Sequence, residues 1–370
     1  MNTAKLENLE AIALIVLVMT SKIILNLPKT ILTNIGTSSW INAIYISFLA
    51  LLAVLLIVHL FKNFPGYDIL DISKYLGGET LKKLMAIFYI VFFIVNATLI
   101  VRSFSESIKI IYFNNLPLII IIAFFVISSC IANIFGLKAL AKTNLIVAPL
   151  ALLSIIITII SSIQNFVPQR LFPILGHGLS QTFISGSNNI FLFSILAYLF
   201  FLVPILQNQK DYKKVSIISV LVSAFYLIAS IICLQLVFPF IYQSKEHLSI
   251  YLLIRMAHSG DIIQRFISFF FFVWILSVLC YISISIYFSV HVTTKITNIS
   301  NTKCITYLSG LLVFGCTLLF NNYSQYTIII EKIFKPSTTI FLFIINIIVL
   351  LLANIKLKIK KGLNLNEKNL

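Results

Sequence analysis

The stretch TSKIILNLPKT, residues 20–30, lies in the first long apolar run of the chain and contains a lysine, an asparagine and a proline. Pro28 has no backbone N–H and its ring clashes with the carbonyl of residue 24, so a helix should kink or unwind around residues 24–28. A break of this kind inside a membrane frees backbone carbonyls and amides that need partners. Ser21 and Asn26 would add a hydroxyl and a carboxamide at the same place.

The composition identifies an integral membrane protein. Of the 370 residues 60% are hydrophobic, the mean hydropathy is +1.05 and only 10% are charged, whereas soluble domains carry about 25% charged residues. Several apolar runs are about 20 residues long, which is the length that a helix needs to cross a lipid bilayer. The net charge of +16 comes from basic residues dispersed among short loops, a pattern that favours membrane orientation over nucleic-acid binding.

The apolar runs and the loops between them predict ten membrane spans, which are about 10–33, 40–61, 84–112, 116–134, 144–165, 190–206, 215–241, 262–290, 304–320 and 335–355. Most of the basic residues lie in the N-terminal segment, the even-to-odd loops and the tail, so the positive-inside rule places both termini in the cytoplasm. The first run follows the acidic start LENLE without a small-residue cleavage site. We therefore expect it to remain as a span rather than to be removed as a signal peptide.

Ten spans with both termini on one side fit two five-helix halves of opposite topology, about residues 10–165 and 190–355, followed by a basic tail at 356–370. Inverted-repeat transporters are built in this way, and they bind substrate near the midplane where broken helices meet. Span six follows the polar stretch ISGSNN, residues 184–189, so it offers a second break to match the one at Pro28. We therefore predict a single membrane domain with a small-molecule pocket between spans one and six.

Lys22 is the most informative charge in the chain. It lies about twelve residues into the first span, and a cation at this depth is a functional-site hypothesis by default. The alternatives are that the proline kink marks no site, and that Lys22 is a structural cation paired with a carbonyl or reaching a wet vestibule. Arg102 and Glu106 stand at helical spacing and more simply predict a salt-bridged helix end than a proton relay.

Other polar side chains could line the same pocket. Tyr89 and Asn96 are seven residues apart on span three and so share a helical face, and Tyr281, Ser283 and Ser285 lie on span eight. Serines in membrane helices also bond their own backbone, which is the simpler reading of each.

Two tryptophans and the segment before span six have structural readings. Trp40, beside a loop, reads as an interfacial anchor, and Trp274, inside an apolar run, as a packed core residue. The segment 166–189 could form a short surface helix over the pocket, with Gly176 and Gly178 permitting sharp turns; the alternative is a plain connection.

The sequence lacks the elements of catalysis. Glu106 is the only carboxylate inside a predicted span apart from Glu10 at a border, and the histidines and cysteines are scattered. No phosphate-binding loop, nucleophile elbow, metal-ligand cluster or pair of catalytic acids is recognisable. We therefore expect no enzyme, no metal site and no cofactor.

Several stretches taken together resemble the B subunits of spore germination receptors, the spore permease family. Those stretches are LNLPKTI (25–31), KNFPGYDILDISKYLGG (62–78), VRSFSESIKIIYFNNLP (101–117), NIFGLKALAK (133–142), RLFPILGHGL (170–179) and IIQRFISFFFFVWILSVLCYISISIYF (262–288). The resemblance implies the leucine-transporter-like inverted-repeat fold of the amino acid-polyamine-cation superfamily. It also implies a nutrient-sensing role in the spore inner membrane, beside an A-type subunit and a lipoprotein C-type subunit.

The resemblance carries over site residues at the first break and at the start of span six, namely Ser21, Lys22, Asn26, Leu27, Pro28, Asn189, Phe193 and Ser194. Two departures fall among them. A glycine and a small residue usually precede the first break in that family, where this chain has Ser21 and Lys22. Span six commonly carries a glutamate nine residues before a proline, where this chain has Ile195.

A lysine gained and a glutamate lost shift the local charge by about two units. Because an isolated charge at membrane depth is costly, we expect a ligand with an anionic group near Lys22. The same fold and pocket would serve a secondary transporter of amino acids or related solutes. A structural subunit whose pocket has decayed is the third reading.

Overall fold

The computed structural model describes residues 5–25, 31–32, 35–239, 253, 260–299, 301–320 and 328–366, and these residues are almost entirely helical. The long α-helices are α1 (Asn8–Leu25), α3 (Ser39–Phe61), α4 (Ile69–Ile111), α5 (Leu118–Ile134), α6 (Leu137–Ser162), α8 (Tyr212–Val237), α11 (Gly260–Thr297), α12 (Thr302–Leu318) and α15 (Asn346–Asn366). The predicted all-α class is confirmed, and the described residues form one isolated β-bridge, between Leu6 and Leu206.

Six of the described helical segments are long and apolar enough to cross a membrane: Gly36–Phe61, Ile69–Ile111, Leu137–Asn165, Gln209–Val237, Ile267–Thr297 and Glu331–Lys360. Two further apolar helices, α5 and α12, are somewhat shorter. Each of these segments overlaps a span that the sequence predicts, so the chain is a multi-pass membrane protein.

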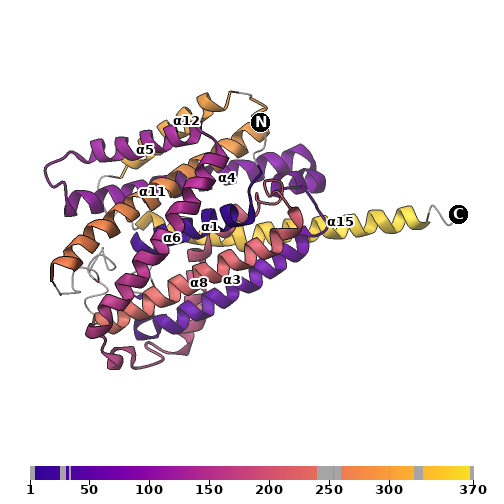
Figure 1. Ribbon diagram of the computed structural model, residues 1–370. Helices are drawn as coiled ribbons and strands as arrows, with labels where there is room; N and C mark the ends of the chain where they lie inside the picture. Colours follow the sequence, from indigo (N-terminus) through magenta and orange to yellow (C-terminus); the bar gives the residue numbers. More distant parts are fainter. Residues whose placement is uncertain are drawn as a thin grey trace.

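Helix α1 lies in the middle of the bundle, where it packs against α6, α8 and α11. Around it, α3 runs beside α8, α5 lies beside α12, and the long α11 crosses α4 (Figure 1). The residues of α1 from Leu14 to Val18 are almost completely buried. A helix enclosed in this way has no lipid-facing side, so its polar residues must find partners inside the protein.

Helix α4 begins with a strong local signal. The Asp68 side chain accepts hydrogen bonds from the backbone amides of Leu70 and Asp71, and the Asp71 side chain bonds back to the Asp68 amide in a capping box. The helix then bends at Gly77 and Gly78, where Gly78 has a φ of 71° that other residues rarely adopt. The first turns of α4 therefore lie at an angle to the membrane span that follows.

Span six is not a regular helix. It consists of a π-helical turn (Ser180–Ile184), a nine-residue 3₁₀-helix (Ser185–Phe193), the short α7 (Leu196–Leu199) and further turns that end near Leu206. Its backbone amides repeatedly bond three residues back, as Ser194 to Phe191 and Ala197 to Ser194. A 3₁₀-helix of this length is uncommon and often marks a functional segment. The predicted interruption of span six is thus confirmed.

The connection before span six folds over the start of α3. It contains two short 3₁₀-turns, and Gly176 and Gly178 have φ values of 49° and 109°, so the predicted sharp turns at both glycines are confirmed. The Thr37 hydroxyl donates to the carbonyl of Pro173 at 2.6 Å. The surface helix expected here is replaced by turns, because these contacts and the two glycines bend the backbone.

Candidate ligand-binding site

Lys22 occupies the centre of a buried polar cluster. It lies on the last turn of α1 with 8% of its surface exposed, and its Nζ donates a hydrogen bond of 2.7 Å to the Ser194 hydroxyl of span six. The same Nζ lies 5.7 Å from the ring centroid of Tyr281 on α11, at the distance of a cation–π contact. Three separate spans therefore meet at this one ammonium group.

The charge of Lys22 has no carboxylate partner among the described residues. The ion pairs formed by these residues join Lys74 and Lys82 to Glu79, Arg102 to Glu106, Lys138 to Glu7 and Glu10, Lys295 to Asp68 and Asp71, and Lys335 to Glu331. A hydroxyl and a ring face stabilise an ammonium only weakly compared with an anion. Lys22 is therefore a buried cation with unfilled capacity for an anionic partner.

The walls of this cluster are polar and tied together. Ser21 donates to the carbonyls of Leu17 at 2.9 Å and Ser277 at 3.0 Å, which pins α1 to α11. The Tyr281 hydroxyl donates to Asn96 Oδ1 on α4 at 3.0 Å. Of the residues predicted for the pocket, the structure thus brings Ser21, Lys22, Asn96, Ser194 and Tyr281 together.

Ser285 belongs to the neighbouring layer. Its hydroxyl lies 2.9 Å from that of Tyr198, which also hydrogen-bonds Tyr281. The Tyr198 ring contacts Phe93 and Phe288, with centroids 5.1 and 5.2 Å apart. The Ser283 hydroxyl, in contrast, donates to the carbonyl of Leu279 on its own helix. This is the backbone bonding that was the alternative to a pocket role for the serines.

Asn189 lies in a second cluster near the N-terminal end of span six. Its Nδ2 donates to Asn42 Oδ1 at 2.9 Å, and its Oδ1 accepts from Lys335 Nζ at 3.1 Å. A cavity of about 350 Å³ lies over these side chains and reaches Glu331, which pairs with Lys335 at 3.5 Å. Along a 3₁₀-helix rising about 2.0 Å per residue, the five steps from Asn189 to Ser194 span about 10 Å.

Two further predicted residues, Tyr89 and Phe193, are buried and make other contacts. The Tyr89 hydroxyl donates to Asn346 Oδ1 on α15 at 2.9 Å, and the Tyr89 ring packs edge-on to Phe201. Phe193 is completely buried in the 3₁₀-helix beside Ser194. Asn26, Leu27 and Pro28 lie outside the described residues, since α1 is described as far as Leu25.

Four residues of these clusters were not predicted: Asn42, Tyr198, Lys335 and Asn346. Asn42 and Asn346 stand alone in apolar runs, and such isolated carboxamides in a predicted span are the signal that could have marked them. Lys335 resembles an ordinary loop charge at the border of a span. The other structural readings fare better, since Arg102 pairs with Glu106 at 2.7 Å and Trp274 is buried among aromatic rings.

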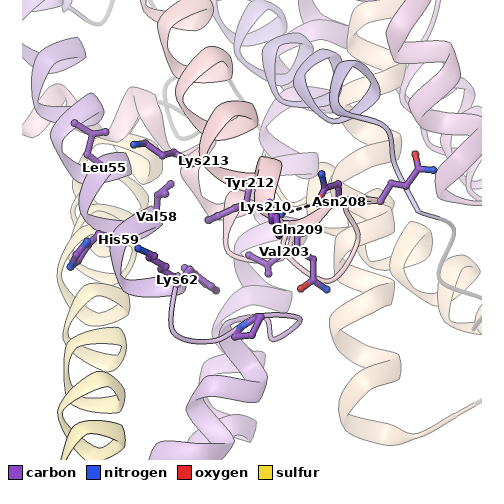
Figure 2. Close-up of a pocket in the computed structure, with 13 residues that line it drawn as sticks. Leu55, Val58, His59, Lys62, Val203, Asn208, Gln209, Lys210, Tyr212 and Lys213 are labelled. Carbon is purple, nitrogen blue, oxygen red and sulfur yellow. Dashed lines mark hydrogen bonds between the residues drawn. The ribbon is translucent and has the colours of Figure 1, made fainter.

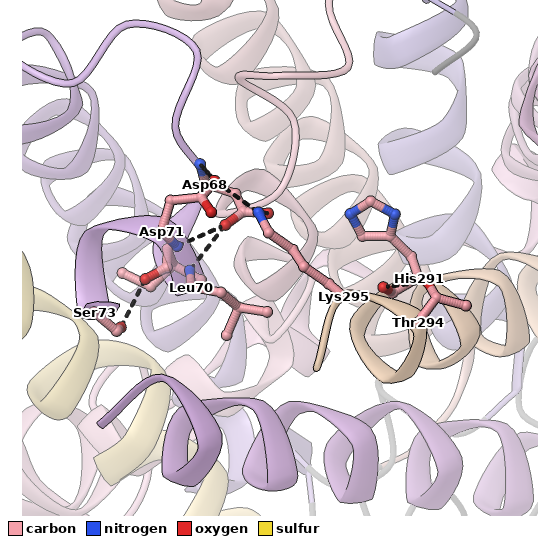
Figure 3. A network of polar contacts seen from close by, with 8 residues as sticks. Asp68, Leu70, Asp71, Ser73, His291, Thr294 and Lys295 are labelled. Atoms are coloured by element: carbon pink, nitrogen blue, oxygen red, sulfur yellow. Dashed lines mark hydrogen bonds and ion pairs between the residues drawn. The ribbon is translucent and has the colours of Figure 1, made fainter. Parts of the chain in front are cut away.

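A charged network lies at the start of α4 (Figure 3). Lys295, near the end of α11, donates to Asp68 Oδ2 and Asp71 Oδ2, both at 2.6 Å. Asp68 is completely buried, and burial raises its pKa to about 6, with the Lys295 ion pair opposing the shift. This network joins α11 to the start of α4, so it holds two of the longest helices together at this end.

The irregular sixth span, the enclosed first helix and the buried polar cluster between them define a multi-pass membrane protein with the transporter fold named after the leucine transporter. MhsT, in its crystal structure in complex with L-phenylalanine, matches with a TM-score of 0.64 at 13% identity, covering 93% of this chain and 98% of that one. Mhp1, a nucleobase-cation-symport-1 family transporter in a closed conformation with bromovinylhydantoin bound, matches with a TM-score of 0.61 at 13% identity, covering 93% and 78%.

The family described as spore germination protein, the spore permease family, matches residues 5–326, and the chain belongs to it. Spore germination protein YndE of Bacillus subtilis (strain 168) is 22% identical over 312 residues, which are 84% of this chain and 85% of that protein. Spore germination protein KB of the same organism is 22% identical over 298 residues, or 77% and 78% of the two chains. The expected family is thereby confirmed.

Proposed function

We propose that this protein is the nutrient-sensing membrane subunit of a germination receptor in the spore inner membrane, with both termini in the cytoplasm. The observation that carries the proposal is Lys22, a buried cation that contacts Ser194 and Tyr281 and no carboxylate of the described residues. A protein that holds such a charge at membrane depth gains most from a ligand that neutralises it. The site therefore suits binding rather than catalysis.

The ligand proposed for this site is a small molecule with a carboxylate, and an amino acid is the first choice. A carboxylate would replace Ser194 as the partner of Lys22 with a stronger, charge-assisted hydrogen bond. The fold neighbour MhsT holds L-phenylalanine, which supports amino acids as the first probes. Asn96, Ser21 and Tyr281 would bound the remaining polar part of the ligand.

The sensing step proposed is a shift between conformations of the bundle. Ligand that bonds Lys22 breaks the link between α1 and span six, so it favours a conformation in which these segments separate. An A-type subunit and a lipoprotein C-type subunit would respond to that conformation. The cavity at Asn189 and Lys335 offers the ligand a route from the outer end.

Germination of a deletion strain tests this proposal. Spores complemented with the wild-type gene, with Lys22→Met or with the control Lys83→Met, an exposed lysine, are exposed to the L-amino acids and to their carboxamides. The wild type and the control should respond to at least one acid and not to its amide, whereas Lys22→Met should respond to neither. A normal response of Lys22→Met at equal protein abundance contradicts the proposal.

A secondary transporter is the second candidate, and it is favoured by the transporter fold of both solved neighbours. Uptake of the activating amino acid into vesicles that contain the purified protein alone separates the two functions. Uptake against a gradient would establish transport, whereas binding without uptake supports the receptor. Spores of the deletion strain that respond normally to every nutrient would leave a structural subunit as the remaining function.

A further inference from the structure

A large cavity lies at the end of the bundle opposite the Asn189 cluster, between the C-terminal end of α3 and the turn that precedes α8 (Figure 2). Its volume is about 880 Å³, within the range of pockets that bind small molecules. The site proposed for nutrient does not use this cavity, and none of the predicted site residues lines it. Its lining is divided into a cationic part and an apolar part.

The cationic part consists of Lys62, which directly follows α3, and of Lys210 and Lys213 from the turn and the start of α8, and the His59 side chain lies beside them. All four side chains are exposed, and none takes part in an ion pair between described residues. The acidic residues nearby, Glu7 and Asp211, line a neighbouring cavity instead. Figure 2 shows that Lys62 and Lys213 reach the cavity from two different helices.

The N-terminal end of α8 lies beside the cationic part of the cavity. Its N-cap residue Asp211 makes no capping bond with its side chain, which accepts a hydrogen bond from Asn8 at 2.9 Å instead. Helix N-termini attract anions because their amides and their dipole point outward. The positive charge of the cavity therefore comes from its lysine side chains.

The apolar part of the lining continues onto the lipid-facing surface. Leu55 and Val58 line the cavity, and Leu55 belongs to an exposed row on α3 that runs through Leu52 and Phe48. On α8, Leu221 and Phe225 are exposed on the helix that begins at the cavity. Because α3 and α8 pack side by side, two apolar helix faces lead from the membrane to one cationic pocket.

We propose that this cavity binds an anionic phospholipid, with the phosphate headgroup between Lys62, Lys210 and Lys213 and the acyl chains along α3 and α8. A pocket that is apolar toward the membrane and cationic toward water matches an amphiphile whose head is negative. Basic pockets between membrane helices take anionic headgroups by this chemistry, and each lysine near the surface adds attraction. A free phosphate ester would satisfy only the cationic part.

Native mass spectrometry of the purified full-length protein tests the proposal with phosphatidylglycerol and phosphatidylcholine of equal chain length. The test variant carries Lys62→Gln, Lys210→Gln and Lys213→Gln. The matched control carries Lys83→Gln, Lys303→Gln and Lys358→Gln, which remove the same charge from exposed lysines outside the cavity. A third variant with arginine at the three test positions keeps the charge.

The wild type, the control and the arginine variant should retain phosphatidylglycerol. The affinity of the glutamine variant for this lipid should be lower by at least about tenfold. Equal binding of the two lipids, or an equal loss in the control, overturns the proposal. Displacement of the lipid by excess glycerol 3-phosphate would assign the site to a soluble phosphate ester. A glutamine variant that keeps the lipid and loses association with the other receptor subunits would assign the surface to a protein partner.

Discussion

Two lysines of this protein make contacts that involve the same long helix, α11, one near its middle and one near its C-terminal end, and they do so by different means. Lys295 reaches from α11 to the carboxylates of Asp68 and Asp71, each at 2.6 Å. Lys22 lies against Tyr281 of α11 and bonds the Ser194 hydroxyl at 2.7 Å. One cation is neutralised within the chain, and the other contacts only neutral groups among the described residues.

The difference separates a structural role from a binding role. A buried charge that is paired and hydrogen-bonded needs nothing further, and breaking the pair is costly. A buried charge that contacts only a hydroxyl and a ring gains when an anion arrives. The paired Lys295 is therefore expected to hold α11 to the start of α4, and Lys22 is expected to bind ligand.

The largest effect is expected from giving Lys22 an internal partner. Ser194→Asp places a carboxylate where the hydroxyl now lies, so Lys22 becomes a paired lysine like Lys295. The carboxylate should exclude an anionic ligand and raise the amino acid concentration needed for germination by about a thousandfold or more. Ser194→Asn, a neutral change of similar size, is the control, and an unchanged dose–response curve of the aspartate variant contradicts the comparison.

Removal of the paired charge should act on stability. Lys295→Met leaves Asp68 buried with no cation, and the loss of one partner of a buried ion pair costs about 3 kcal/mol. The thermal midpoint of the purified protein in detergent should fall clearly, and Lys295→Arg should restore most of it. If the thermal midpoint of Lys295→Met equals that of the wild type while its nutrient response is lost, Lys295 rather than Lys22 has the binding role.

A smaller effect is expected from Ser194→Ala. This change removes one neutral partner of Lys22, and a hydrogen bond to a charged group contributes about 1.5 kcal/mol or somewhat more. Lys22 would then be less tied to span six, so ligand should bind as well or slightly better. Thermal-shift titration with the activating amino acid measures this, and a tenfold loss of affinity would show that Ser194 itself holds the ligand.

The smallest effect concerns pH. Burial raises the pKa of Asp68 to about 6, above its ordinary value of 3.8, so the folded protein binds this proton more readily than the unfolded chain. The unfolding free energy should therefore rise as the pH is lowered from 7 to 6, by less than about 1 kcal/mol. Asp68→Asn should remove this component, and a wild type and variant with parallel pH profiles would contradict the assigned pKa.

Sequence reasoning predicted which residues belong to the buried polar site better than it predicted which residues they contact. The depth of Lys22 in the first span predicts a site there, the family resemblance implies Ser194, and the structure bonds the two directly. Asn189 and Tyr89 were named for the same pocket but contact Lys335 and Asn346 instead. Helical periodicity shows which residues share a face, but the rotation of one helix against another is set by packing across the whole bundle.

The fold was more accessible because its causes are local. Span lengths follow from the apolar runs, and the interruption of span six follows from the polar, glycine-containing stretch 184–189. The capping box at Asp68 and the bend at Gly78 also have local causes, although they were not predicted here. The buried contact of Lys335 could not be predicted from its local sequence, because a lysine at the border of a span usually faces water.

The winding of span six has a geometric consequence for Lys22. A 3₁₀-helix advances about 2.0 Å and 120° per residue and an α-helix about 1.5 Å and 100°. Rewinding the nine residues Ser185–Phe193 into α-helix would shorten the segment by about 4.5 Å and turn its far end through about half a revolution. This rotation would move the Ser194 hydroxyl away from the Lys22 ammonium group. A change of helix type in this segment would therefore couple an axial displacement of span six to the loss of its contact with α1.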